Sequence, residues 1–397
     1  MIHDLHAASL ANVRVVLSTI GRFHTFDLAR ELFARESLTA VFTGYPAFKL
    51  RNERLPAKII HSFPWVHTPY MGFRFRPLLG RRINRAWEYL DKITLDRHVS
   101  RRLPQCDVFV GLSGSALASG RVARSRGAKY VCDRGSTHIR TQDALLRDEH
   151  ARWGMPFDGI DPRVIEREEA EYAEADCITV PSTFTLNSFV ERGVASTKLR
   201  RLSYGVNLER FRPTGTPNPK RFDILFVGAT SLRKGLPYLL EAYRQVVHAR
   251  KSLTLVGVPD AAVVAALKAR GAWPDDVILR GPLPQEQLKD VMSRSHVLVC
   301  PSIEEGLAMV QAEAMACGCP VISSRHTGAE DLFDDGREGF IVPFRSAYAI
   351  SERLQQLADD AGLRARLSSA SLERVGRMGG WRDYGGRAHA TYAALIA

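Results

Sequence analysis

Short apolar runs alternate with amphipathic stretches along the chain, and this alternation constrains the fold more than any other feature. The runs read as β-strands in two series, at 13–19, 38–43, 107–113, 129–133 and 177–182, then 222–228, 252–258, 276–281, 296–302, 320–324 and 339–343. Helix patterns such as 236–250 and 285–294 fill the gaps. Strands that alternate with helices indicate βαβ units and parallel sheets, so an α/β fold is expected.

A proline-rich segment, RPTGTPNPK (212–220), separates the two series of strands. Such composition is typical of an extended linker, and 397 residues suit two domains. We expect a first Rossmann-like domain over 1–203, a linker over 204–220 and a second Rossmann-like domain over 221–378. Ligands of doubly wound sheets lie beyond the carboxyl ends of the strands, so two facing domains predict a cleft between them.

The net charge, the length of the apolar runs and the start of the sequence limit the expected partners and location of the protein. The formal net charge of +12 suits an anionic partner, which could be a phosphorylated substrate, a lipid surface or nucleic acid, but it also suits a solvated basic surface. No apolar run approaches the roughly 18 residues of a membrane-spanning helix. The start, MIHDLHAASLANVR, lacks the basic and apolar regions of a secretory signal. We expect a cytoplasmic protein, with contact to the inner face of the membrane left open.

Cysteine and aspartate spacing gives no sign of a metal site. The six cysteines fall mostly in or beside apolar runs, which fits buried thiols in a reducing compartment. Cys317 and Cys319 have no matching Cys/His pair nearby, so a zinc site is not expected. No two aspartates are two residues apart, so a metal-binding Asp-x-Asp is absent from the sequence. We therefore expect no metal and no cofactor.

Two adjacent cations follow the strand at 222–228, in the loop GATSLRKG. Arg233 and Lys234 stand between a strand end and a helix start, where free backbone N–H groups and the helix dipole favour anions. The spacing is not that of a Walker A motif, which has Gly-Lys followed by Ser or Thr. A phosphate site and a solvated loop both remain open on this pattern alone.

The segment EEGLAMVQAEAMACGCP (304–320) predicts a helix that is buried on most sides and yet carries Glu313. An unpaired buried carboxylate costs several kcal/mol, so Glu313 should face a cation, a donor or a ligand cavity, with an internal salt bridge as the alternative. Glu305 precedes it by eight residues, or about 12 Å along a helix axis. That separation exceeds the roughly 5 Å between the carboxylates of a retaining glycosidase, and it suits two acceptors that hold separate sugars of one ligand.

The pattern PSxxEG…EAMACGxPVI, with seven residues between its two glutamates, resembles the signature of glycosyltransferase family 4, a family of retaining enzymes with the GT-B fold. FVG…KG with LLEAY resembles the family's phosphate-binding loop. VPSTFTLNSFVERGV and LSYGVNLERFRP resemble its crossing between domains. The tail, 379–397, resembles the final helix that crosses back to the first domain. The resemblance implies two facing Rossmann-like domains, the first for the acceptor and the second for a nucleotide-sugar donor.

The resemblance also implies roles in the second domain. Glu305 would hydrogen-bond the donor sugar in a catalytic role, Glu313 would bind the nucleotide ribose and Lys234 the diphosphate. The family's arginine position is occupied by Ala229, so we expect Arg233 to supply the second positive charge.

Two short segments complete the donor site that the resemblance implies. The family turn EGFGL is altered here to Gly306-Leu307-Ala308, and losing its second glycine changes how closely backbone amides approach the sugar. Gly281 and Leu283 match the loop around the nucleobase.

In the first half of the chain the resemblance rests on fewer residues. Gly21 matches the glycine turn that lines the family's cleft, and His138 is the best match to a histidine beside the donor sugar, which makes it the second catalytic candidate. Arg134, with Asp133 and Ser136, belongs to the same segment. A lone histidine is more often structural or exposed, so that alternative stays open for His138.

A basic stretch at 72–102 carries nine Lys/Arg against three acids, interleaved with Phe73, Phe75, Leu78, Leu79 and Trp87. Such a stretch suits an interfacial helix on anionic lipid, but equally a solvated helical face. Of the three explanations for this basic stretch, nucleic-acid binding is the least favoured, because no recognised nucleic-acid motif accompanies the charge. We therefore do not expect nucleic acid as a partner.

Taken together, the sequence favours a metal-independent, retaining glycosyltransferase of polysaccharide or glycoconjugate biosynthesis. Its partners would be a UDP- or GDP-linked nucleotide sugar as co-substrate and a glycan or lipid-linked acceptor. Two alternatives remain: a nucleotide-sugar epimerase or phosphorylase of the same fold, and a non-catalytic basic module that binds membrane or nucleic acid.

Overall fold

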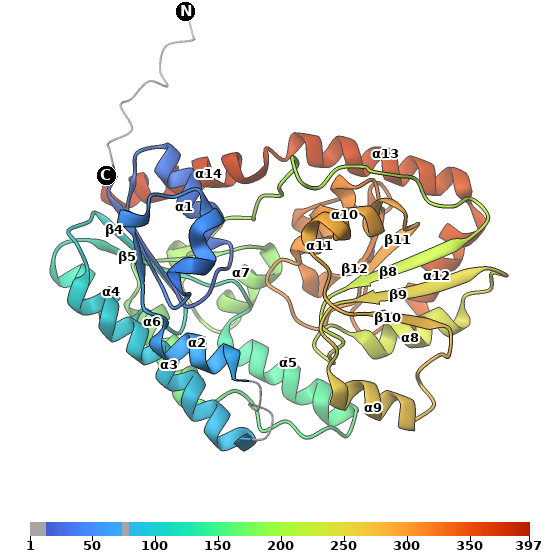
Figure 1. Ribbon diagram of the computed structural model, residues 1–397, viewed down its shortest axis with the longest axis horizontal. Helices are drawn as coiled ribbons and strands as arrows, with labels where there is room; N and C mark the ends of the chain where they lie inside the picture. The colour runs from blue at the N-terminus through green and yellow to red at the C-terminus, as the bar shows by residue number, and fades with distance from the viewer. Residues whose placement is uncertain (1–12, 74–78) are drawn as a thin grey trace, which may run out of the picture.

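Two parallel β-sheets, one in each half of the chain, form the framework of the protein (Figure 1). The computed structural model describes residues 13–73 and 79–397. The first sheet has the strand order β3-β2-β1-β4-β5-β6-β7, with β1 (Val15–Thr19), β2 (Leu38–Thr43), β3 (Ile60–Ser62), β4 (Val108–Leu112), β5 (Lys129–Asp133), β6 (Cys177–Val180) and β7 (Leu199–Arg201). The second has the order β10-β9-β8-β11-β12-β13, with β8 (Phe222–Val227), β9 (Lys251–Val256), β10 (Val277–Arg280), β11 (Val297–Cys300), β12 (Val321–Ser324) and β13 (Gly339–Val342).

Helices cover both faces of each sheet, as the βαβ pattern requires. Those of the first domain are α1 (Thr25–Ala34), α2 (Pro64–Gly72), α3 (Gly80–Arg102), α4 (Leu117–Ser125), α5 (Ile139–Arg152), α6 (Pro162–Glu174) and α7 (Thr183–Val190). The second domain has α8 (Leu236–Gln245), α9 (Ala261–Ala269), α10 (Gln285–Ser293), α11 (Met309–Ala316), α12 (Ala347–Asp359) and α13 (Ala361–Arg377). The last helix, α14 (Gly380–Ile396), lies against α1 of the first domain, where Arg35 Nη2 donates to the carbonyl of Arg382 at 2.7 Å (Figure 1).

Both sheets reverse their strand order once, and the loops at those points face each other. In the first sheet the reversal lies between β1 and β4, and in the second between β8 and β11. The carboxyl ends of strands at such a switch point are the usual ligand crevice of an α/β sheet. The loops that follow β8 and β11, with Arg233, Lys234 and Glu305, therefore stand at the switch point of the second sheet.

The chain crosses between the domains twice, and the two crossings touch. One crossing leads from β7 to β8, and the other joins α13 to α14. At Gly205 an added Cβ would overlap the backbone of Gly380, so the two segments pack with no side chain between them. Gly380 itself has φ +60°, a conformation that glycine adopts without strain.

Helix α5 reaches the second domain at its C-terminal end (Figure 1). There Glu149, which is fully buried, accepts hydrogen bonds from Trp153 Nε1 at 3.0 Å, from Tyr238 of α8 at 2.9 Å and from Arg345 at 2.6 Å. A buried carboxylate is stable only when donors surround it, so this contact fixes α5 against the second domain.

The α/β class with two parallel sheets is confirmed, whereas two edge strands escaped the sequence analysis. β3 and β7 have three residues each and are largely exposed or half-buried, so they carry no apolar run to detect. The predicted helix over 236–250 is too long, because Val246 is extended and Lys251 Nζ donates to the carbonyls of Tyr243 and Val246 at 2.8 and 2.6 Å, which ends the helix.

The basic stretch 72–102 is described in part, since Phe75 and Leu78 lie outside the described residues. The rest belongs mainly to α3, where Ile83 and Leu90 are exposed while Asp91 and Asp96 are buried. Among the described residues, no helix combines the length and apolar character that crossing a membrane requires.

Candidate active site

The loop after β11 is joined to the first domain by Glu304. This fully buried carboxylate accepts hydrogen bonds from Ser136 Oγ at 2.6 Å, from Thr137 N and Oγ1 at 3.1 and 2.8 Å, and from Gln142 Nε2 at 3.1 Å. In its own domain Arg233 Nε lies 3.0 Å away. Burial alone would raise the pKa of Glu304, but the charge of Arg233 and these hydrogen bonds lower it to about 2. Sequence analysis missed this residue.

Three of the predicted residues meet beside Glu304. Lys234 Nζ forms an ion pair with Glu305, and Arg233 Nη2 lies 3.8 Å from the same carboxylate. The Arg233 and Lys234 side chains are 36% and 20% exposed, so both cations can reach an entering ligand. The cluster of these four side chains has no net charge, and an anionic ligand could take the two cations over from the carboxylates.

The turn between Glu305 and α11 is pressed against the first domain. An added Cβ at Gly306 would overlap the carbonyl oxygen of Gly135, and the Gly306 carbonyl accepts hydrogen bonds from Ser182 Oγ at 2.5 Å and Thr185 Oγ1 at 3.2 Å. Leu307 and Ala308 are buried in the same contact. The predicted helix therefore begins later than Leu307, at Met309, because the turn is used for contact between domains.

Replacing Gly306 by alanine is expected to lower the stability of the protein by about 1–3 kcal/mol, because the new methyl group forces the Gly135 and Gly306 backbones apart. Gly281→Ala is the matched control, since a Cβ there meets nothing within 4 Å. Denaturant unfolding of the two variants gives the comparison. Equal unfolding midpoints for both would contradict the close approach.

A cavity of 960 Å³ lies between the domains, next to this turn. Its walls come from α1 and the segment before it, from 51–54, from 207–211 and from the second domain, where Met309 and Glu313 of α11 and Gln285 of α10 contribute. Trp381 of α14 completes the lining. The cavity thus joins both domains and both chain crossings in one space.

Glu313 lines this cavity, and its carboxylate makes no ion pair or hydrogen bond within residues 13–73 and 79–397. Burial raises its pKa to about 7, partly opposed by the charge of Arg210 and reinforced by that of Asp27. Of the two alternatives for this residue, an internal salt bridge and a ligand cavity, the structure matches the cavity.

The other predicted residues take different positions. Gly21 precedes three residues, 22–24, that line the cavity, and Gly281 is exposed with open space around it. Leu283 is half-buried and packs against the core just before α10. Gly21 and Leu283 thus stand within two residues of the cavity lining, whereas Gly281 does not, and the roles of all three stay predictions.

His138 is the N-cap of α5. Its Nδ1 accepts from the backbone N–H of Arg140 at 3.3 Å, and its ring packs between Tyr172 and Phe189, with both centroid distances 5.1 Å. Burial lowers its pKa to about 4. The ring lines neither of the two cavities described in this section, and a catalytic role for His138 stays a prediction.

The histidine that lines the cavity is His24, which sequence analysis did not select. Its Nε2 lies 2.7 Å from Asp133 Oδ2, and its ring stacks on Tyr204 with the centroids 4.2 Å apart. Its place in the sequence could have identified it, because His24 lies three residues after Gly21 in the loop that follows β1. That loop is at the switch point of the first sheet.

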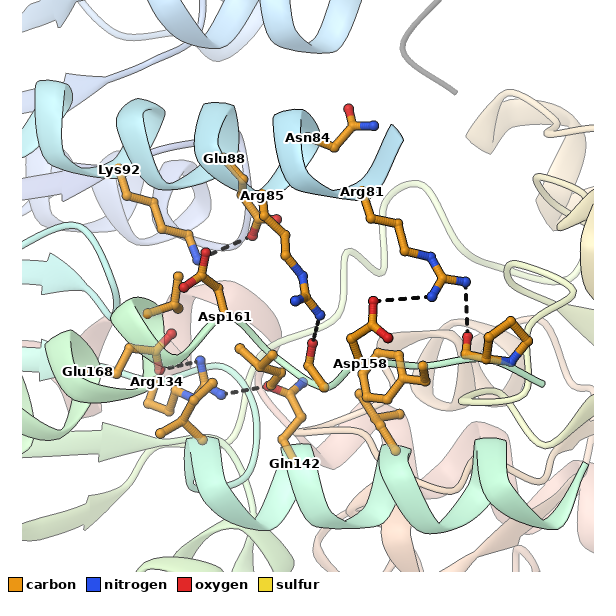
Figure 2. A pocket seen from close by; sticks show the side chains of 17 residues that line it. Arg81, Asn84, Arg85, Glu88, Lys92, Arg134, Gln142, Asp158, Asp161 and Glu168 are labelled. Atoms are coloured by element: carbon orange, nitrogen blue, oxygen red, sulfur yellow. Dashed lines mark hydrogen bonds and ion pairs between the residues drawn. The ribbon is translucent and has the colours of Figure 1, made fainter. Parts of the chain in front are cut away.

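A second cavity, of 610 Å³, lies in the first domain between α3, α5, α6 and the loop 156–161 (Figure 2). Its lining carries three ion pairs: Arg81 of α3 with Asp158 of the loop at 3.2 Å, Lys92 with Glu88 one turn away on α3 at 3.4 Å, and Arg134 with Glu168 of α6 at 2.8 Å. Gln142 lies on its floor and also donates to Glu304, so this cavity borders the charged cluster of the second domain. Paired donors and acceptors without excess charge suit a polyhydroxylated ligand.

Comparison with known proteins agrees with this arrangement. Residues 208–374 match the family model of glycosyl transferases group 1. A D-inositol 3-phosphate glycosyltransferase of Streptomyces bingchenggensis is 32% identical over 197 residues, which are 44% of this chain and 43% of the relative. The putative colanic acid biosynthesis glycosyltransferase WcaL of Escherichia coli is 27% identical over 216 residues, 50% of this chain and 53% of the relative. The chain thus spans about half the length, or less, of these relatives.

Among solved structures, Anabaena HepE in complex with UDP and glucose superposes with a TM-score of 0.71 at 14% identity, covering 96% of this chain and all of that one. A likeness at this identity concerns the fold. The expected GT-B fold, with two facing Rossmann-like domains, is confirmed by this superposition and by the two parallel sheets.

Proposed function

We propose that this protein is a retaining glycosyltransferase that moves a sugar from a UDP- or GDP-linked nucleotide sugar to a glycan or lipid-linked acceptor, in polysaccharide or glycoconjugate biosynthesis. The observation that carries the proposal is the meeting of Arg233, Lys234 and Glu305 at the switch point of the second sheet. On the helix that follows Glu305, the unpaired carboxylate of Glu313 lines the interdomain cavity. The family match over 208–374 and the UDP and glucose bound by Anabaena HepE support it.

The proposed roles follow from charge and position. Lys234 and Arg233 leave their carboxylate partners for the diphosphate and neutralise the leaving group in place of a metal ion. Glu305, released from Lys234, accepts hydrogen bonds from the donor sugar, and Glu313 accepts from the ribose hydroxyls. The departing phosphate oxygen takes the proton of the attacking hydroxyl on the same face, so the configuration is retained.

The charge-balanced cavity of Figure 2 supports a glycan acceptor, because its lining suits neutral sugars. Contact with a membrane through α2 and α3 is a further part of the proposal, supported by exposed Trp65 and Met71 on α2 and by exposed Ile83 on α3. Cosedimentation with anionic vesicles measures it. We also propose a cytoplasmic location, supported by the six cysteines, which are all free thiols and all buried.

Calorimetric titration with UDP and GDP tests the proposal directly. Saturable binding of one of them, followed by transfer or hydrolysis of the corresponding nucleotide sugar with retained configuration, is the expected result. A protein that binds neither nucleotide would refute the donor site, and an inverted product would refute the retaining mechanism.

Nucleotide affinity is expected to increase about five- to tenfold as the pH rises through about 7, because Glu313 then ionises and its carboxylate becomes a stronger acceptor for ribose hydroxyls. Below that pH the protonated side chain lacks the charge. Titrations at several pH values compare the parent with Glu313→Gln. The phosphate groups of the nucleotide ionise equally in both titrations, so the difference in pH dependence between the two proteins reports on Glu313. Glu209→Gln, in the same cavity lining, is the control. A pH dependence that is unchanged in Glu313→Gln would remove Glu313 from the ribose contact.

A further inference from the structure

His24 and Asp133 form a buried pair on the wall of the interdomain cavity. The side chains are each 10% exposed, with His24 Nε2 at 2.7 Å from Asp133 Oδ2. Asp133 ends β5 and also accepts from Thr179 Oγ1 at 2.8 Å, so its carboxylate is held from two sides. The stacking on Tyr204 fixes the plane of the imidazole ring. Together these contacts leave the ring little freedom to turn.

The pairing determines which nitrogen of His24 is available. A carboxylate only accepts, so Nε2 carries the hydrogen and donates it to Asp133. In the neutral ring Nδ1 then holds a lone pair. Within residues 13–73 and 79–397, Nδ1 has no hydrogen-bond partner. An acceptor atom on a side chain that is nine-tenths buried normally finds a donor, so this nitrogen is suited to a ligand in the cavity.

The ring lies close to the charged cluster of the second domain. A Cβ at Gly135 would stand 3.9 Å from His24 Cε1, and the carbonyl of the same Gly135 packs against Gly306. Gly306 directly follows Glu305, the proposed donor-sugar contact. His24 is thus separated from the turn that carries Glu305 by the backbone of one residue.

We propose that His24 Nδ1 accepts a hydrogen bond from the acceptor hydroxyl that attacks the donor sugar, with Asp133 as the positioning residue that sets its tautomer. This inference rests on the proposed function and adds the acceptor contact to it. The hydroxyl oxygen bonds to the anomeric carbon while the bond from that carbon to the diphosphate oxygen breaks. The single hydrogen of the hydroxyl is shared between Nδ1 and the departing phosphate oxygen in the bound complex. As the new bond forms, the proton passes to that phosphate oxygen, so His24 orients the hydroxyl and stays neutral.

The His24–Asp133 pair could have a structural role alone, in which it joins the start of α1 to β5. One substitution distinguishes this role from a contact with the acceptor. In His24→Gln the side-chain amide reaches the position of Nε2 and still donates to Asp133, but nothing replaces Nδ1. If the pair only ties the two elements, glutamine restores the parent's behaviour. If Nδ1 contacts the acceptor, glutamine does not. His67→Asn is the matched control, because His67 forms a second buried His–Asp pair, with Nδ1 at 2.7 Å from Asp91 Oδ2, and lines neither cavity.

The experiment measures four properties of the parent and both variants: UDP and GDP binding, nucleotide-sugar hydrolysis without acceptor, transfer to a panel of methyl hexosides, and the unfolding midpoint. In His24→Gln, kcat/KM for the hexoside is expected to fall about 100-fold, because the hydroxyl is no longer oriented. Nucleotide binding, acceptor-free hydrolysis and the midpoint should stay within about twofold or a few degrees of the parent.

Each outcome decides a different claim. If His24→Gln transfers sugar at the parent's rate, the inference is refuted and the proposed function stands. The inference is also refuted if acceptor-free hydrolysis falls as much as transfer does, because that result would indicate general damage to the site. A parent that binds neither nucleotide refutes the proposed function itself. A parent that binds nucleotide but glycosylates no hexoside counts against the sugar-acceptor class and against this contact.

Discussion

Replacing Lys234 by alanine is expected to lower kcat/KM for the nucleotide-sugar donor by about 10²–10³-fold, which is the usual effect of removing one group that stabilises developing negative charge. Lys234 stands at the switch point of the second sheet, and its ammonium is paired with Glu305 alone among the described residues. Its removal withdraws one of the two cations available to the diphosphate. Steady-state kinetics with UDP- and GDP-sugars, together with UDP and GDP titrations, measure the loss.

Two variants make the Lys234 result interpretable. Lys234→Arg keeps the charge and should retain more activity than the alanine variant. Lys268→Ala removes an exposed lysine from α9 of the same domain and should leave kcat/KM unchanged. If Lys234→Ala and Lys268→Ala behave alike, Lys234 has no part in binding the leaving group.

Glu304→Ala is expected to destabilise the protein by about 1–3 kcal/mol, the usual cost of leaving buried hydrogen-bonding groups without their partner. The substitution leaves Arg233 without its 3.0 Å partner and leaves Ser136, Thr137 and Gln142 without their common acceptor. Denaturant unfolding measures the change. Glu373→Ala, which breaks an exposed pair with Arg377, is the control and should cost less than about 1 kcal/mol.

The same residue gives the stability a dependence on acid. The folded pKa of Glu304, about 2, lies below its ordinary value of 4.5, so its contribution is fully present above pH 4.5 and is lost as the pH falls toward about 2. Unfolding curves over that range should converge for the parent and Glu304→Gln. Parallel curves, with the same difference at every pH, would show that Glu304 is not ionised in the folded protein.

The sequence predicts the centre of each sheet well because buried parallel strands must be continuous apolar runs. Eleven of the thirteen strands are found in this way, and β3 and β7 are not because a short edge strand is exposed and follows no such rule. Local pattern also places Arg233, Lys234 and Glu305 on loops that converge, since all three follow the carboxyl ends of neighbouring strands in one sheet, and it places Glu313 on the next helix.

Contacts between the domains are what local pattern cannot predict. Glu304 and Glu305 are neighbours in sequence, but the partners of Glu304 in the first domain lie more than 160 positions earlier. The residues around the two glutamates do not indicate that Glu304 is the fully buried one. His24 and His138 pose the same difficulty. Each begins a helix after a strand of the first sheet, and only the packing of Tyr172 and Phe189 around His138 and of Tyr204 on His24 decides which ring lines the cavity.

The contact of Gly205 with Gly380 determines how the two domains can move. Both chain crossings pass through this one place, which makes it the natural hinge for a rotation of one domain against the other. The contact of Glu149 with Tyr238 and Arg345 joins the domains at the C-terminal end of α5. Figure 1 shows α5 on the other side of the molecule from α14. A rotation at the two glycines therefore moves the C-terminal end of α5 away from the second domain. The hydrogen bonds of Glu149 to Tyr238 and Arg345 must break before the domains can open in this way.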